Sequence, residues 1–144
     1  MMIHLTIIAL SAALFAYWFR CSCLLILRAQ TSEDYTSRVI VSAQLTISET
    51  LSRLEDGPAA SLKGVRHALD RDYLQVCRLL DAPSDRDTCL SSVECAFLKM
   101  DYWLLRMVSR VCGETFPSKA RAAMREMGAI VQCFANAAGS TASA

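Results

Sequence analysis

The chain has 144 residues, is 53% hydrophobic and carries a formal net charge of only +1. This length fits one domain with an additional segment. A near-neutral domain argues against nucleic acid as a partner, because such affinity comes largely from the neutralisation of phosphates. All 14 acidic residues lie at Glu33 or beyond, so the first 30 residues form a separate, apolar segment.

The N-terminal segment predicts a transmembrane helix over residues 1–28. Residues 3–19 read IHLTIIALSAALFAYWF, a helix of roughly 25 Å, and continuation through CLLIL to Arg28 gives roughly 37 Å. A cleaved signal peptide is disfavoured because no Lys or Arg precedes position 20. A buried core helix is disfavoured by this length without acidic residues. We therefore expect a single-pass anchor in contact with the lipid bilayer.

The end of this helix carries residues that are typical of a membrane–water interface. Tyr17 and Trp18 precede Arg20, and Arg28 closes the apolar stretch. Aromatic rings and arginine gather at that boundary, so these four residues are predicted interface anchors. We expect the hydrocarbon to end within 19–27, with the Arg20 guanidinium reaching toward the headgroups. The alternative is that Arg20 is buried against the carboxylate of a partner protein.

Flanking charge predicts the orientation of the anchor. The N-terminal side offers only the α-amine and His4, whereas Arg20, Arg28 and Arg38 follow the apolar core. Positive charge favours the cytoplasmic side, so the C-terminal domain is expected in the cytoplasm.

One face of the apolar helix carries small residues up to Arg20. Spacings of three and four place the following residues on that face: Thr6, Ala9, Ala13, Ala16 and Arg20. Small residues let a second helix approach closely, so this stripe is a predicted packing interface for subunits of a membrane protein complex. The alternative is that alanine is simply common in apolar helices.

The remainder predicts an all-α fold, a small antiparallel bundle over residues 31–137 followed by a flexible tail over 138–144. A 3.6-residue apolar period runs through four segments: 31–54, 60–80, 89–112 and 118–137. The apolar face of the second consists of Leu62, Val65, Leu69, Tyr73, Val76 and Leu80. The stripe of the third consists of Val93, Phe97, Met100, Leu104, Met107 and Val111. The face of the fourth consists of Ala123, Met127, Ile130, Val131 and Phe134.

The seven cysteines do not form a metal-binding pattern. None lies in a CxxC spacing, and Cys89 and Cys95 are six residues apart, which turns them to different sides of a helix. No metal or other cofactor is expected. Hairpin geometry would allow Cys77–Cys89 and Cys95–Cys133 disulfides, although a cytoplasmic domain would keep these thiols reduced.

Two further cysteines, Cys21 and Cys23, lie at the expected membrane edge. They are either S-acylated or ordinary interfacial residues, and no sequence motif separates the two cases.

The inventory of catalytic groups is too small to indicate an enzyme. His4 and His67 are the only histidines, and the chain has five glycines and no phosphate-binding loop. Glu94 and Asp101 fall on one side of a helix as a conceivable carboxylate pair, but a solvated face beside Lys99 is the simpler interpretation.

The adjacent Tyr102 and Trp103 are the candidate surface for a partner, because they diverge by about 100° and cannot both point inward. Anchor, bundle and missing catalytic groups together predict a non-catalytic accessory or assembly subunit of a membrane complex. The alternative is a membrane-anchored adaptor that recruits a soluble partner, and either could form homo-oligomers.

Overall fold

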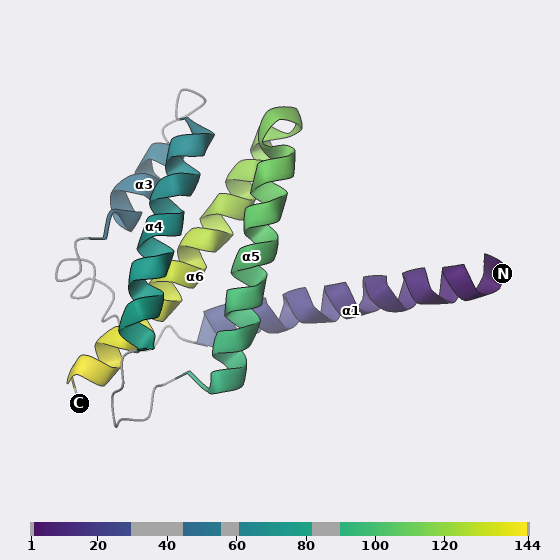
Figure 1. Cartoon of the computed structure of the whole chain (residues 1–144), viewed down its shortest axis with the longest axis horizontal. Coiled ribbons are helices and arrows are strands. Elements are labelled where there is room, and N and C mark those ends of the chain that lie inside the picture. The colour runs from purple at the N-terminus through teal and green to yellow at the C-terminus, as the bar shows by residue number, and fades with distance from the viewer. Residues whose placement is uncertain (1, 30–44, 56–60, 82–89, 144) are drawn as a thin grey trace.

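The computed structural model describes residues 2–29, 45–55, 61–81 and 90–143, and within these ranges the chain is all-helical. The all-α prediction is therefore confirmed for this part of the chain, while the prediction for residues 31–44 lies outside it. The helices are α1 (Met2–Ala29), α3 (Ile47–Glu55), α4 (Leu62–Leu80), α5 (Ser92–Thr115) and α6 (Pro117–Ser143). Helices α3 to α6 pack together and are called the helical body below (Figure 1).

Helix α6 lies at the centre of the helical body and contacts each of the other helices. It runs back along α5 after the turn at Phe116, and α4 lies on its other side (Figure 1). Every residue of its predicted apolar face is buried, which confirms that face. The sequence predicted that this helix ends at residue 137. The helix instead continues to Ser143, and Ala138 is still buried.

Helix α4 begins at a capped N-terminus and packs through its predicted face. The backbone N–H of Gly64 donates a hydrogen bond to Ser61 Oγ at 3.4 Å, which satisfies one of the free donors of the first turn. Val65, Leu69 and Val76 are buried in the core, as their spacing predicted.

The start of α3 is held by a carboxylate from α4. Asp72 is fully buried, and its Oδ2 accepts hydrogen bonds from the Thr46 N–H at 2.8 Å and the Thr46 hydroxyl at 3.2 Å. Burial raises the pKa of Asp72, and the two Thr46 hydrogen bonds oppose that rise. A titratable group therefore fixes the position of α3.

This arrangement predicts an unusual pH dependence of stability. Because the folded pKa of Asp72 lies above the usual 3.8, the folded state holds its proton longer than the unfolded state does. The contribution of Asp72 to stability should be complete in acid and fall as the pH rises from 3.8 through the folded pKa. We expect denaturation at several pH values to show wild type losing stability relative to Asp72→Asn over that window.

The control for this experiment is the exposed Asp81, 68% accessible at the end of α4. Asp81→Asn should not produce the same trend. A difference between wild type and Asp72→Asn that stays constant or grows with pH would contradict the role given to Asp72.

Gly128 allows α6 to approach α3 closely. A Cβ added at this position would lie 2.8 Å from Leu51 Cδ2, the flexible end of that side chain. Gly128→Val is expected to lower the free energy of unfolding by about 1–3 kcal/mol through overpacking. Thermal unfolding should show that adding Leu51→Ala recovers part of this loss, and a purely additive double variant would refute the contact.

Helix α5 is turned differently from the sequence expectation. Leu98, Tyr102 and Leu105 point into the core, whereas most of the predicted stripe, Val93, Met100, Leu104, Met107 and Val111, is exposed. The buried side of α5 also carries Asp101 and Ser109. Because the inward face contains polar residues, the outward face has the more apolar sequence and was predicted to be the core side. That prediction was wrong.

Helix α1 joins the helical body only through its C-terminal half. Phe19 and Cys23 are buried where α1 meets α5 and α6, while residues 4–18 are all exposed. The N-terminal half consequently projects away from the helical body (Figure 1). Residues His4–Arg28 are long and apolar enough to cross a membrane, with a mean hydropathy of 1.7. Only 11% of their most apolar window is buried, which is unlike the core helix of a soluble protein.

Candidate functional site

The junction between α1 and the helical body is built on aromatic packing. The Phe19 ring stacks on Phe97 of α5 with centroids 5.3 Å apart, and Trp18 meets the same ring edge-on at 6.4 Å. One turn further along α1, the Cys23 thiol lies 3.9 Å from the carbonyl oxygen of Phe97. These contacts fix the rotation of α1 about its axis.

That rotation directs Arg20 between two acidic side chains of the same chain. Its Nη1 donates to both carboxylate oxygens of Asp101, at 2.8 and 2.9 Å. Its Nη2 donates to Glu126 Oε2. One guanidinium therefore joins α1 to α5 and α6 together.

The two carboxylates differ sharply in their surroundings. Asp101 is 1% exposed, whereas the Glu126 side chain is 36% exposed. Burial raises the pKa of Asp101, and the hydrogen bonds and charge of Arg20 oppose that rise. Arg20 therefore supplies the interactions that favour the ionised form of the buried Asp101 carboxyl group.

An apolar groove of about 580 Å³ opens directly beside this ion pair. Phe15 and Ala16 of α1, Met100 and Leu104 of α5, and Glu126 of α6 are among the residues that line it. The groove lies in the angle between the projecting part of α1 and the helical body.

Arg20 occupies neither of the two positions that the sequence suggested. It does not extend away from the protein, and the carboxylates that bind it come from its own α5 and α6. The physical reason is that a lone arginine in an apolar helix and a lone aspartate on the inner face of α5 are each costly unless paired. The expectation of a solvated Asp101 beside Lys99 is wrong.

The other predicted residues of α1 lie on its exposed part. Thr6, Ala9, Ala13 and Ala16 are exposed, and Ala16 continues into the groove. Tyr17, Trp18 and Arg28 are also exposed. The small-residue stripe therefore lies on the same helix face as Arg20, and this face leads into the groove.

The pair Tyr102 and Trp103 divides between core and surface. Tyr102 is buried, its ring stacks on Tyr73 at 3.8 Å, and its hydroxyl donates to Asp70 Oδ1 at 3.1 Å. Burial and the nearby Asp70 carboxylate both raise the pKa of Tyr102. Trp103 is 55% exposed, so of the two only Trp103 is available to a partner.

The remaining candidates from the sequence, the cysteines of the helical body and Glu94, do not form a reactive or metal-binding cluster within the described residues. Cys77, Cys95 and Cys133 are not joined in disulfides, and Cys89 lies outside the described residues. Glu94 accepts the Ser91 N–H in the capping box that starts α5. Asp101 lies seven residues later, about 10 Å along the helix, and binds Arg20 instead. Within the described ranges no three His, Cys, Asp or Glu side chains come together as metal ligands.

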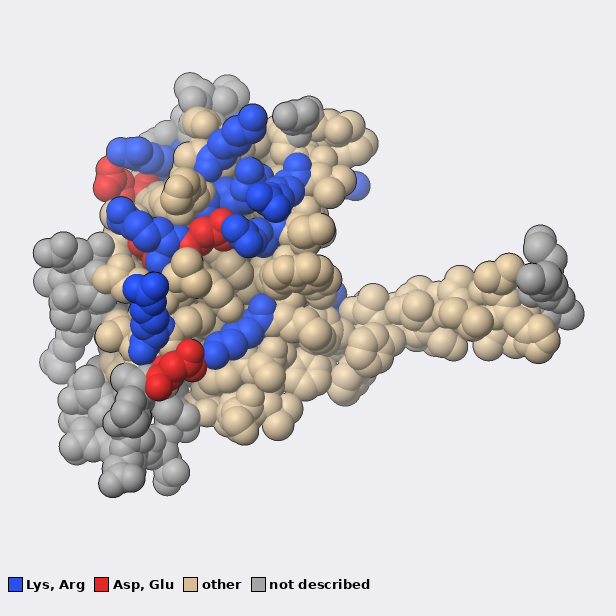
Figure 2. All heavy atoms as spheres, viewed as in Figure 1, with Lys and Arg blue, Asp and Glu red and all other residues tan. Residues whose placement is uncertain are grey.

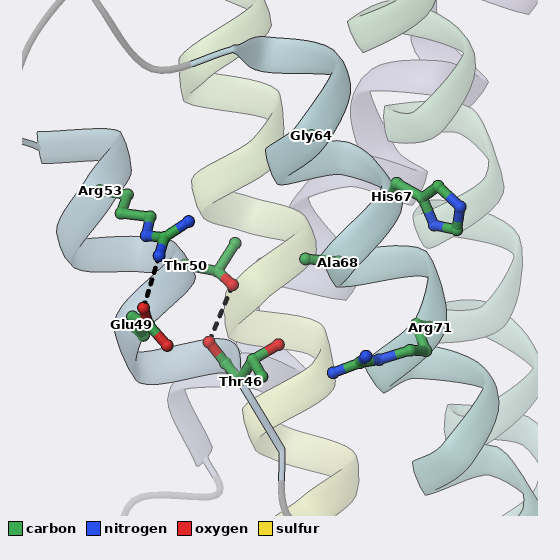
Figure 3. A pocket seen from close by; sticks show the side chains of 8 residues that line it. All are labelled: Thr46, Glu49, Thr50, Arg53, Gly64, His67, Ala68 and Arg71. Atoms are coloured by element: carbon green, nitrogen blue, oxygen red, sulfur yellow. Dashed lines mark hydrogen bonds and ion pairs between the residues drawn. The ribbon is translucent and has the colours of Figure 1, made fainter.

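A second cavity, of about 470 Å³, lies between α3 and α4. Arg53, His67 and Arg71 line it, and Arg53 donates to Glu49 at 2.6 Å (Figure 3). Lysine and arginine side chains gather on this side of the helical body with few acids among them (Figure 2). The surface there is suited to an acidic partner.

Comparisons with protein-family profiles, with curated proteins and with solved structures give no match for this chain. The residues that sequence reasoning missed are Asp101 and Glu126 as partners of Arg20, and Phe97 as the ring that receives α1. One signal was present: Arg20 is an isolated charge within the apolar helix α1.

Proposed function

We propose that this chain is a non-catalytic, single-pass membrane accessory subunit. In this proposal α1 inserts into the bilayer and docks to the other subunits, while the helical body covers the complex on the cytoplasmic side. The observation that carries it is the projecting α1, whose large apolar side chains are more than half exposed from Leu5 to Trp18. An apolar surface of this extent is typical of contact with lipid or with another protein.

The small-residue stripe supports docking in particular. A partner helix that packed along Ala9 and Ala13 would continue into the groove beside Ala16 and Arg20. The groove is already shaped and fixed by the Arg20 ion pairs, so docking there requires little ordering of the chain.

The experiment compares two sets of substitutions on α1 that keep its hydropathy high. Native membranes are extracted in mild detergent, and the band that contains the chain is analysed by native electrophoresis and mass spectrometry. Ala9→Leu with Ala13→Leu should remove the chain from a complex of fixed composition. The matched control, Leu10→Ile with Leu14→Ile on the other faces, should leave it there.

Two results would contradict the subunit proposal. One is migration of the wild-type chain alone or as a small homo-oligomer. The other is loss of the chain from membranes at alkaline pH, which would oppose the anchor itself.

The basic side of the helical body supports a second candidate, a membrane-anchored adaptor for a soluble acidic partner. The cavity between α3 and α4 carries Arg53 and Arg71 at its edge (Figure 3). Arg53→Gln with Arg71→Gln should then weaken a salt-sensitive soluble interaction while the alanine-stripe variant retains it.

A further inference from the structure

We infer that the exposed face of α5 lies on an anionic bilayer surface, so that α5 is an interfacial helix at the base of α1. This inference rests on the proposed insertion of α1. It adds a second membrane-contacting element and a lipid preference that the anchor alone does not supply.

The first argument is the composition of the exposed face of α5. At about 100° per residue, one side of the helix carries Met100, Trp103, Leu104, Met107, Val108 and Val111. All six are exposed, Val111 by 73%. Arg110 follows Trp103 at the edge of this face, seven residues later, and the exposed Lys119 of α6 lines the adjoining groove. Arg106, also near this edge, is paired with Asp70. An apolar face with a tryptophan and basic residues at its edge is typical of helices that lie in the plane of an anionic membrane.

The second argument is the direction of that face. Met100, Leu104 and Val108 line the groove together with Phe15 and Ala16, so they face the projecting part of α1. In Figure 1 α1 leaves the helical body on the α5 side and runs crosswise to α5. A bilayer that surrounds the projecting helix therefore meets this face of α5 first.

The chain supplies its own probes, because Trp18 on α1 and Trp103 on α5 are its only tryptophans. The full chain is reconstituted in phosphatidylcholine–phosphatidylglycerol vesicles that contain lipids brominated either near the headgroup or near the chain end. In Trp18→Phe, emission from Trp103 should fall more with the shallow bromine than with the deep one. In Trp103→Phe, Trp18 reports on insertion of α1 independently.

The outcomes separate the two proposals. Quenching of Trp18 without quenching of Trp103 would overturn the α5 inference and leave the anchor intact. If neither Trp18 nor Trp103 were quenched, both the α5 inference and the proposed insertion of α1 would be overturned. In the Trp18→Phe background, Val111→Glu should reduce the quenching of Trp103, whereas Leu79→Glu, an exposed position on α4, should not.

Discussion

Substitution of Arg20 by methionine is expected to lower the free energy of unfolding by about 2–3 kcal/mol and to release α1 from the helical body. The loss arises because Asp101, 1% exposed, keeps a buried negative charge without its cation. The upper part of the usual range for a broken buried pair is not expected, since the Arg20 side chain is itself 33% exposed.

Two measurements in detergent micelles test this result. Thermal unfolding followed by circular dichroism gives the stability, and maleimide labelling mapped by mass spectrometry reports release of α1. Cys23 is fully buried at the junction, so it should react in Arg20→Met and stay protected in wild type.

The controls separate charge from packing. Glu126→Gln changes the exposed carboxylate and should cost little, because exposed ion pairs contribute at most about 1 kcal/mol. Arg20→Met with Asp101→Asn removes both charges of the buried pair and should be more stable than Arg20→Met alone. If the single and double variants were equally stable, the charge on Asp101 would not be the cause.

Phe134→Ala should be the most destabilising change in the helical body, at about 3–5 kcal/mol. Phe134 is completely buried on the central helix α6, and its ring lies 6.2 Å from that of Tyr73 on α4. Removal of the ring would leave a cavity where α6 supports the stacked Tyr73 and Tyr102, so α4 and α5 would both lose support.

Denaturant unfolding in micelles provides the measurement, with Val111→Ala as the matched control. Val111 is 73% exposed, so its truncation should leave stability within about 0.5 kcal/mol of wild type. A loss below about 1 kcal/mol for Phe134→Ala would show that the core closes around the missing ring.

The sequence predicted those parts of the fold whose apolar residues lie on a single face. In α4 and α6 only one face of the helix is apolar. The burial of Val65, Leu69, Ile130 and Phe134 could therefore be predicted from the sequence. In α5 two sides are apolar, and periodicity cannot tell which of them faces protein.

The candidate site was harder to predict because its parts are distant in the chain. Arg20 could be identified as a charge that needs a partner, yet its partners lie 81 and 106 residues away. Helical periodicity describes neighbours within a few turns and carries no information about which helices meet. Asp101 also looked solvated, because Lys99 lies two residues before it in the sequence although the two side chains differ in direction by about 160°.

The position of the Arg20 partners has a consequence for how the chain is made. Synthesis proceeds from the N-terminus, so α1 leaves the ribosome before Asp101 and Glu126 have been translated. During that interval Arg20 has neither carboxylate, and the surfaces that receive Phe19 and Cys23 do not yet exist. The contacts with Phe97 and Asp101 require α5, and the junction is complete only once Glu126 of α6 has been translated. Prematurely terminated chains would carry α1 without this junction, a difference that quality-control proteases could recognise.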